Sequence, residues 1–118
     1  MTKITTHILD LTHGCPAAFV KVDFYHIQSE SKRIKLSHGT TNEDGRLANP
    51  LFSSEAFESG DYELLFHIGE YYKKQEVQTT NPPFLNQVSV RVGLSSEQEH
   101  YHIPLLVSPW GYQIYRGS

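Results

Sequence analysis

Seven histidines in 118 residues are the side chains with the clearest potential for chemistry. Histidine titrates near neutral pH, so it can transfer protons and bind metals. His100 and His102 flank Tyr101, and alternate residues of a strand point to the same face. We therefore expect His100 and His102 to share one face and Tyr101 to occupy the other. His7 lies in a separate strand-like segment. On residue type alone, a surface or structural role is the simpler interpretation for each histidine.

A metal site is a second interpretation of the same residues. The His100-x-His102 spacing suits ligands on one strand, and neutral imidazoles suit zinc. His7 or His38 could supply a third ligand only through the fold. The sequence contains no Cys-x-x-Cys or His-Glu-x-x-His motif to accompany the pair.

Nucleophilic catalysis has weaker support. Cys15 precedes Pro16 and has His13 two residues away, but nothing in the sequence places a base beside the thiol. No Gly-x-Ser-x-Gly motif is present. Arg46 follows the turn-forming residues 42–45, where it is either a solvated charge or a fork of donors for a carbonyl or carboxylate.

The elements that must position these residues read as short strands separated by turns. The predicted strands are 4–9, 19–28, 33–40, 61–68, 88–94, 101–107 and 112–115, and the one predicted helix is 69–77. This pattern predicts an all-β fold: a two-sheet β-sandwich of about eight strands with one short helix, in a single domain over 1–118. The last strand runs to within three residues of the end, so we expect 115–118 to be tied into a sheet.

The composition and charge of the chain argue against several classes of partner. The net charge is −3 and the lysines and arginines are scattered, so the sequence has no basic patch of the kind that binds nucleic acid. No apolar run approaches the ~18 residues of a membrane span. The single cysteine, Cys15, permits no internal disulfide, and the first residues lack a signal-peptide pattern. We therefore expect no nucleic-acid or membrane partner and a cytoplasmic location.

Separated segments then carry a resemblance to a known family. They read ITTHILD at 4–10, GCPA at 14–17, NEDGRL at 42–47, YHIPLLVSP at 101–109 and YRGS at 115–118. In this order they resemble the transthyretin family over essentially the whole chain. The Tyr-Arg-Gly-Ser ending resembles the 5-hydroxyisourate hydrolase branch, because the hormone-carrying branch lacks it.

The resemblance implies a homotetramer with a central channel and sites at the dimer–dimer interface. It implies catalytic roles for His7, Arg46, His102 and Ser118. It implies substrate binding by His7, Arg46, Tyr115, Arg116, Gly117 and Ser118. His100 keeps its interpretation as a surface residue.

The implied substrate is 5-hydroxyisourate, whose six-membered ring the family opens by hydrolysis to 2-oxo-4-hydroxy-4-carboxy-5-ureidoimidazoline. We hypothesise that His7 and His102 activate water, that Arg46 keeps a histidine neutral and stabilises developing charge, and that Tyr115 makes the site shallow. No metal or organic cofactor is expected, because water is the only second reactant. The alternatives are a carrier of thyroid-hormone-type or other small aromatic ligands, and a sandwich that only contacts partners.

Overall fold

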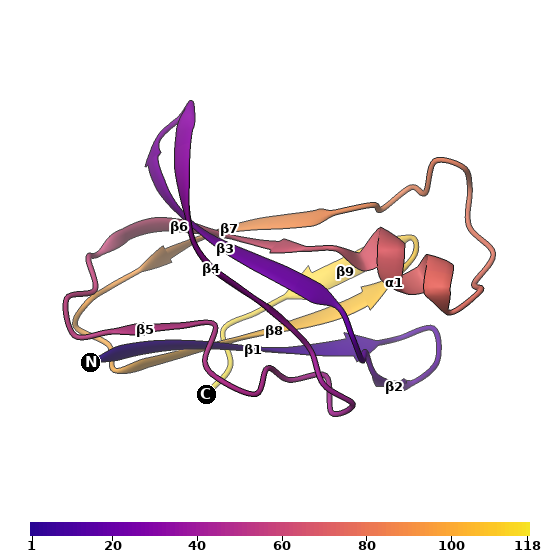
Figure 1. Ribbon diagram of the computed structural model, residues 1–118, viewed down its shortest axis with the longest axis horizontal. Coiled ribbons are helices and arrows are strands. Elements are labelled where there is room, and N and C mark those ends of the chain that lie inside the picture. The colour runs from indigo at the N-terminus through magenta and orange to yellow at the C-terminus, as the bar shows by residue number, and fades with distance from the viewer.

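The computed structural model describes residues 1–118 as two facing sheets and one helix (Figure 1). In chain order the elements are β1 (Thr2–Asp10), β2 (Cys15–Pro16), β3 (Lys21–Ser29), β4 (Lys32–Thr40), β5 (Phe52–Ser54), β6 (Gly60–Phe66), α1 (Ile68–Lys74), β7 (Val88–Leu94), β8 (His100–Ser108) and β9 (Gly111–Ile114). The predicted fold class, a two-sheet β-sandwich with one short helix, is confirmed.

The first sheet is built around β1. It has the order β2-β1-β8-β9, and β5 also pairs with β1. β1 and β8 run parallel, whereas every other strand pair in the molecule is antiparallel. The parallel register places Thr5 opposite His102 and Lys3 opposite His100. Segments almost a hundred residues apart in the sequence therefore share one patch of sheet surface.

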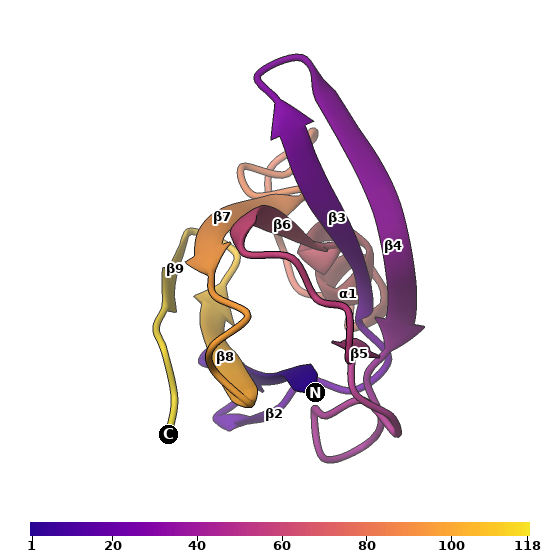
Figure 2. The ribbon, with the colours of Figure 1, turned by 90° about the vertical axis from the view of Figure 1, so that its left-hand side faces the viewer.

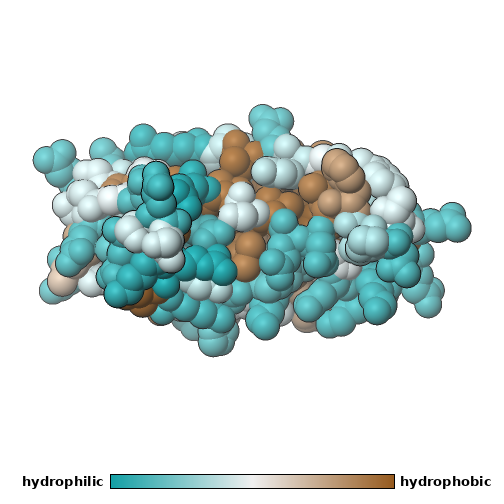
Figure 3. Space-filling model, turned by 90° about the horizontal axis from the view of Figure 1, so that it is seen from above, coloured by the Kyte–Doolittle hydropathy of each residue, from teal (hydrophilic) through white to brown (hydrophobic).

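The second sheet covers the inner face of the first. Its strand order is β4-β3-β6-β7, and the far end of the β3–β4 hairpin rises above the sandwich (Figure 1). The view in Figure 2, turned by 90°, shows the two layers and the chain end descending beside β8. Seen from above, the surface is mostly hydrophilic, with hydrophobic side chains along its middle (Figure 3). The one helix, α1, lacks the length and apolar character needed to traverse a bilayer.

The core lies between the sheets and follows the period-two pattern of the strands. On β1, Ile4 and Ile8 are fully buried, while the odd-numbered residues face outward. On β8, Tyr101 and Ile103 are buried, and His100 and His102 face outward. The prediction that His100 and His102 share a face opposite Tyr101 is therefore confirmed.

Several element bounds differ from the sequence prediction. β5 and β2 were not predicted, because two or three residues carry no periodic pattern; each gains its strand conformation by pairing with β1. Ile68 was predicted to end a strand, but it begins α1 and is fully buried. The helix stops at Lys74 and not at 77, because Glu76 has a positive φ of 58°.

Candidate active site

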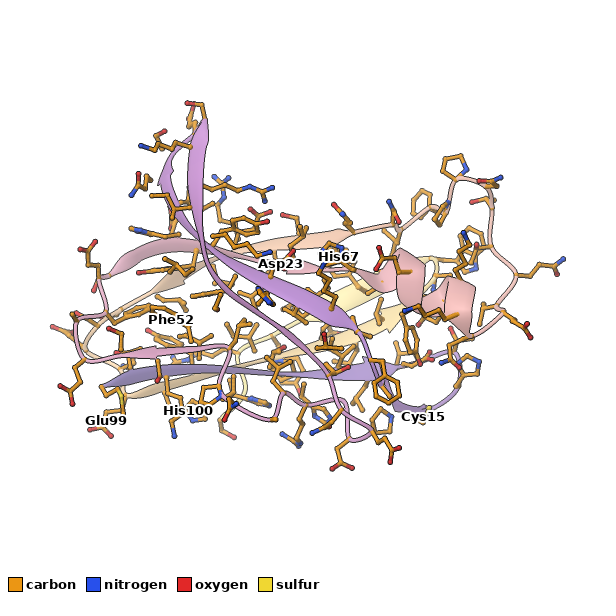
Figure 4. All side chains as sticks on the ribbon, in the orientation of Figure 1. Cys15, Asp23, Phe52, His67, Glu99 and His100 are labelled. Carbon is orange, nitrogen blue, oxygen red and sulfur yellow. The ribbon has the colours of Figure 1, made fainter.

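The outer face of the parallel β1–β8 pair holds the predicted histidines. The Thr5 Oγ1 atom lies 2.8 Å from His102 Nδ1 and 2.8 Å from His100 Nε2, so one hydroxyl joins both imidazoles. The contact follows from the register, since Thr5 and His102 are paired across the two strands. Figure 4 shows His100 on this layer, well away from Cys15 at the other end of the molecule.

A tight turn between β4 and β5 brings Arg46 to the same face. The Asn42 side chain accepts hydrogen bonds from the backbone N–H groups of Asp44 at 2.9 Å and Arg46 at 3.2 Å, which closes the turn. Gly45 has a φ of 73°, and a side chain there would meet the Ile8 carbonyl oxygen at 2.5 Å. The turn packs against β1, and Arg46 forms an isolated β-bridge with His7.

The surroundings of His7 and His102 favour their neutral forms. Their ring centroids are 6.5 Å apart. Partial burial lowers the pKa of both imidazoles below the usual 6.5, and the positive charge of Arg46 lowers it further. A neutral imidazole can accept a proton, so the electrostatics suit general-base chemistry near neutral pH.

The chain end is tied to β8, as the strand pattern predicts. The backbone N–H of Gly117 donates to the His102 carbonyl oxygen at 2.7 Å, and that of Tyr115 donates to the Pro104 carbonyl oxygen at 3.4 Å. A methyl group at Gly117 would approach His102 Cδ2 to 2.8 Å. The backbone at Gly117 therefore lies directly against the edge of the His102 ring.

These pieces surround a polar hollow of about 580 Å³. Only two of its eleven lining residues are hydrophobic. The lining consists of Lys3, Thr5, Thr6, Arg46, Leu47, Ala48, Asn49, Pro50, His100, His102 and Ser118. Arg46, His102 and Ser118 thus meet in one cavity, and His7 lies beside it through its bridge to Arg46 and its proximity to His102.

The single chain does not bring every predicted residue into this hollow. Tyr115 and Arg116 line a separate, mainly apolar hollow of about 260 Å³ between β7 and the β8–β9 pair. The Arg116 guanidinium lies 5.0 Å from the centre of the Tyr101 ring and donates to the Gln98 side chain at 3.3 Å.

Sequence reasoning missed several lining residues. Thr5, Lys3 and Asn49 were not singled out. His100 is exposed, as expected for a surface residue, but it also lines the hollow. Alternation along β1 is a signal that could have put Thr5 on the same face as His7, but only the parallel pairing with β8 reveals its contact with the histidines. No group of three or more His, Cys, Asp or Glu side chains is arranged to hold a metal ion.

The family model and a similar protein of known name both belong to one family. The model of the HIUase/transthyretin family matches residues 4–117. A Pseudomonas aeruginosa protein named 5-hydroxyisourate hydrolase is 42% identical over 118 residues, which span 100% of this chain and 93% of the relative.

Solved structures share the fold. The crystal structure of (S)-allantoin synthase superposes with a TM-score of 0.90 at 36% identity over 99% of this chain, which spans only 44% of that longer protein. Sea bream transthyretin, solved in complex with thyroxine, gives a TM-score of 0.86 at 25% identity, covering 98% of this chain and 94% of that one.

Proposed function

Because the chain belongs to the HIUase/transthyretin family, we propose that it hydrolyses 5-hydroxyisourate to 2-oxo-4-hydroxy-4-carboxy-5-ureidoimidazoline. The observation that carries the proposal is the polar hollow in which Arg46, His102 and Ser118 meet, with His7 alongside. The hollow is large enough to admit a small polar ring, and its lining offers both hydrogen-bond donors and a neutral base.

In the proposed mechanism, His7 and His102 hold a water molecule and remove its proton. The electron pair of the broken O–H bond then attacks the ring carbonyl carbon, and the amide-type C–N bond breaks after the tetrahedral intermediate. The lowered pKa values of both histidines keep a proton acceptor available near neutral pH. The proton returns to the leaving nitrogen, so the histidines end as they began.

Arg46 has two roles in this proposal. Its charge disfavours the imidazolium form of His7 and His102 before the reaction. Its guanidinium also donates to the substrate carbonyl oxygen, where negative charge develops during attack. The Ser118 hydroxyl supplies a further polar contact at the rim. Gly117 keeps the tail close to the ring of His102, and Tyr115 and Arg116 reach substrate from a second subunit.

The proposal is tested by generating 5-hydroxyisourate with urate oxidase and following its ultraviolet decay. The protein should accelerate the decay. His102→Asn should lower the protein-dependent decay rate by about 10²-fold or more, whereas His38→Asn on β4 should leave that rate unchanged. A decay rate equal to the spontaneous one would overturn the proposed function. The reaction should also survive EDTA; loss with EDTA and recovery with zinc would contradict the metal-free mechanism.

We also propose that residues 1–118 form one domain, which a single hydrophobic core cluster supports. The expected assembly is a homotetramer with its sites at the dimer–dimer interface. The site lies on an outer sheet face, and Tyr112 and Tyr115 are exposed at the neighbouring edge, which supports this assembly. The cytoplasmic location stays a prediction that cell fractionation would test.

The carrier alternative rests on the likeness to the sea bream protein solved with thyroxine. A carrier of apolar aromatic ligands needs an apolar channel, whereas only two of the eleven residues that line the hollow around His102 are hydrophobic. Binding of iodinated phenols by equilibrium dialysis, competitive with 5-hydroxyisourate turnover, would distinguish a carrier from a hydrolase.

A further inference from the structure

The Thr5 hydroxyl stands between two imidazole nitrogens and has a single proton. Its oxygen lies 2.8 Å from both His100 Nε2 and His102 Nδ1. A hydroxyl donates one hydrogen bond and can accept others. The Tyr101 carbonyl oxygen is a third acceptor, at the longer distance of 3.5 Å. The hydroxyl can therefore donate to only one histidine at a time, and any histidine to which it does not donate must donate to it. The tautomers of His100 and His102 are consequently coupled through one atom.

We propose that Thr5 is a positioning residue that sets the tautomer of His102 and connects it to His100 as a proton exit to solvent. This inference rests on the proposed hydrolysis and deepens it. In the resting arrangement, His102 Nδ1–H donates to Thr5 Oγ1, and the Thr5 hydroxyl donates to His100 Nε2. His102 Nε2 then carries a free lone pair for the substrate water, and His100 is protonated at Nδ1.

The proton movement balances at each atom. His102 Nε2 takes a proton from water, and the O–H electron pair becomes the nucleophile. The resulting His102 imidazolium passes its Nδ1 proton to Thr5 Oγ1 as the Thr5 proton moves to His100 Nε2. His102 is then neutral and protonated at Nε2, and His100 carries the charge. Where His100 has released the proton, it takes one up again from solvent or buffer. The reverse movement then protonates His102 Nδ1 as His102 Nε2 delivers its proton to the leaving nitrogen, so that no imidazolate forms.

The two histidines differ in the way this transfer requires. His102 is half-buried, and burial and Arg46 both lower its pKa, so it holds a positive charge poorly. His100 is exposed, where water solvates an imidazolium. Charged groups still surround the pair: His7 and Arg46 act on His102, and Lys3 stands opposite His100 across the strands. The charge of Arg46 favours movement of the proton away from His102, and the charge of Lys3 favours its further passage from His100 to solvent or buffer.

Tautomers can be measured without substrate, which separates this inference from the proposed function. In protein labelled with ¹⁵N-histidine, long-range proton–nitrogen spectra should show His102 protonated at Nδ1 in the wild type. Thr5→Val should lose that single tautomer, and Thr5→Ser should keep it. An unchanged His102 tautomer in Thr5→Val would overturn the positioning role, whatever the wild-type activity. If the tautomers are coupled but the wild-type protein shows no activity, only the proposed hydrolysis is contradicted.

Kinetics supply the second readout. Thr5→Val should lower kcat about tenfold to a hundredfold with little change in KM, and Thr5→Ser should stay within about threefold of wild type. The matched control is Thr2→Val, which removes another β1 hydroxyl that donates only to the Gln98 carbonyl oxygen. Thr2→Val should leave kcat unchanged. Equal kcat in Thr5→Val and wild type would overturn the inference.

The exit role of His100 has its own variant. His100→Asn should lower kcat by about threefold to tenfold, because the proton must then leave without an acceptor at that position. Added imidazole should restore part of the rate, since it can accept the proton from the Thr5 side. A wild-type rate in His100→Asn would overturn the exit role.

Discussion

At the residue scale, the environment of His102 explains why a histidine can serve as a base here. Burial disfavours its charged form, and Arg46, His7 and His100 each add a positive or potentially positive neighbour. His7 experiences the same two principal effects, burial first and Arg46 second, while Asp44 acts in the opposite direction. The site is thus tuned by cations that the turn at 42–46 and the β1–β8 register bring together.

Replacing Arg46 with glutamine should move the acid limb of the pH profile. Activity requires neutral histidines, so kcat/KM rises with pH through their pKa, which lies below 6.5 in the wild type. Arg46→Gln removes one lowering cause, so the limb should shift to higher pH, toward but not beyond about 6.5 because burial remains. The plateau should also fall about 10²-fold with loss of carbonyl stabilisation. A limb that moves to lower pH would contradict this account.

One added methyl group tests how closely the tail lies against His102. In Gly117→Ala, the new carbon would meet His102 Cδ2 at 2.8 Å, so the ring or the tail must shift. We expect kcat/KM to fall by about tenfold or more, because small displacements of a catalytic group cost rate steeply. Gly111→Ala is the matched control, since a side chain there meets nothing within 4 Å. Equal kcat/KM values for the two variants would show that tail contact is immaterial.

At the element scale, one buried carboxylate anchors α1 to the first sheet. Asp10, at the end of β1, accepts hydrogen bonds from the hydroxyls of Tyr71 at 2.7 Å and Tyr72 at 2.9 Å. His13 Nδ1 lies 2.5 Å from the same carboxylate. Burial alone would raise the pKa of Asp10, but these hydrogen bonds outweigh it and the pKa is lowered. The helix is only seven residues long, so its stability depends on such contacts.

Asp10→Asn should destabilise the protein by roughly 2–4 kcal/mol, because the amide cannot accept from all of these donors. Urea unfolding measures the loss, and Glu43→Gln, at an exposed acid, is the control. Because the folded pKa lies below the unfolded one, Asp10 stabilises fully above about pH 4, and its contribution disappears as pH falls through the folded value. Identical unfolding midpoints for Asp10→Asn and Glu43→Gln would contradict this role.

The elements that could be predicted from sequence are those whose pattern is local. Alternation located β7 at its observed bounds and the outward pair His100 and His102. The pairing of β1 with β8 is not local, because it joins residues almost a hundred positions apart, and so the contacts of Thr5 were invisible. β5 was missed for a related reason: its three residues are held by β1 and not by their own pattern. Arg46 was found through the family resemblance, since its turn alone left its role open.

At the scale of the whole molecule, the tail residues divide between two hollows. Ser118 lines the polar hollow around His102, whereas Tyr115 and Arg116 line the apolar one between β7 and the β8–β9 pair. Substrate contact by Tyr115 therefore requires a second copy of the chain. Tyr115 is 49% exposed in the single chain, so its ring is accessible to a neighbouring subunit. The proposed homotetramer reconciles the two placements.

Subunit complementation tests this assembly. Sedimentation should give a particle of about four times 13.5 kDa. His102→Asn and Tyr115→Ala should each be nearly inactive alone. The first variant lacks the base, and the second lacks the tyrosine ring that lines the site of the neighbouring subunit. In co-expressed mixed tetramers, about a quarter of the sites should combine an intact His102 from one chain with an intact Tyr115 from another, if the subunits pair symmetrically and at random. Activity should therefore return in the mixed tetramers. If Tyr115 acts on the site of its own chain, no site in the mixture has both residues and the mixed tetramers stay inactive.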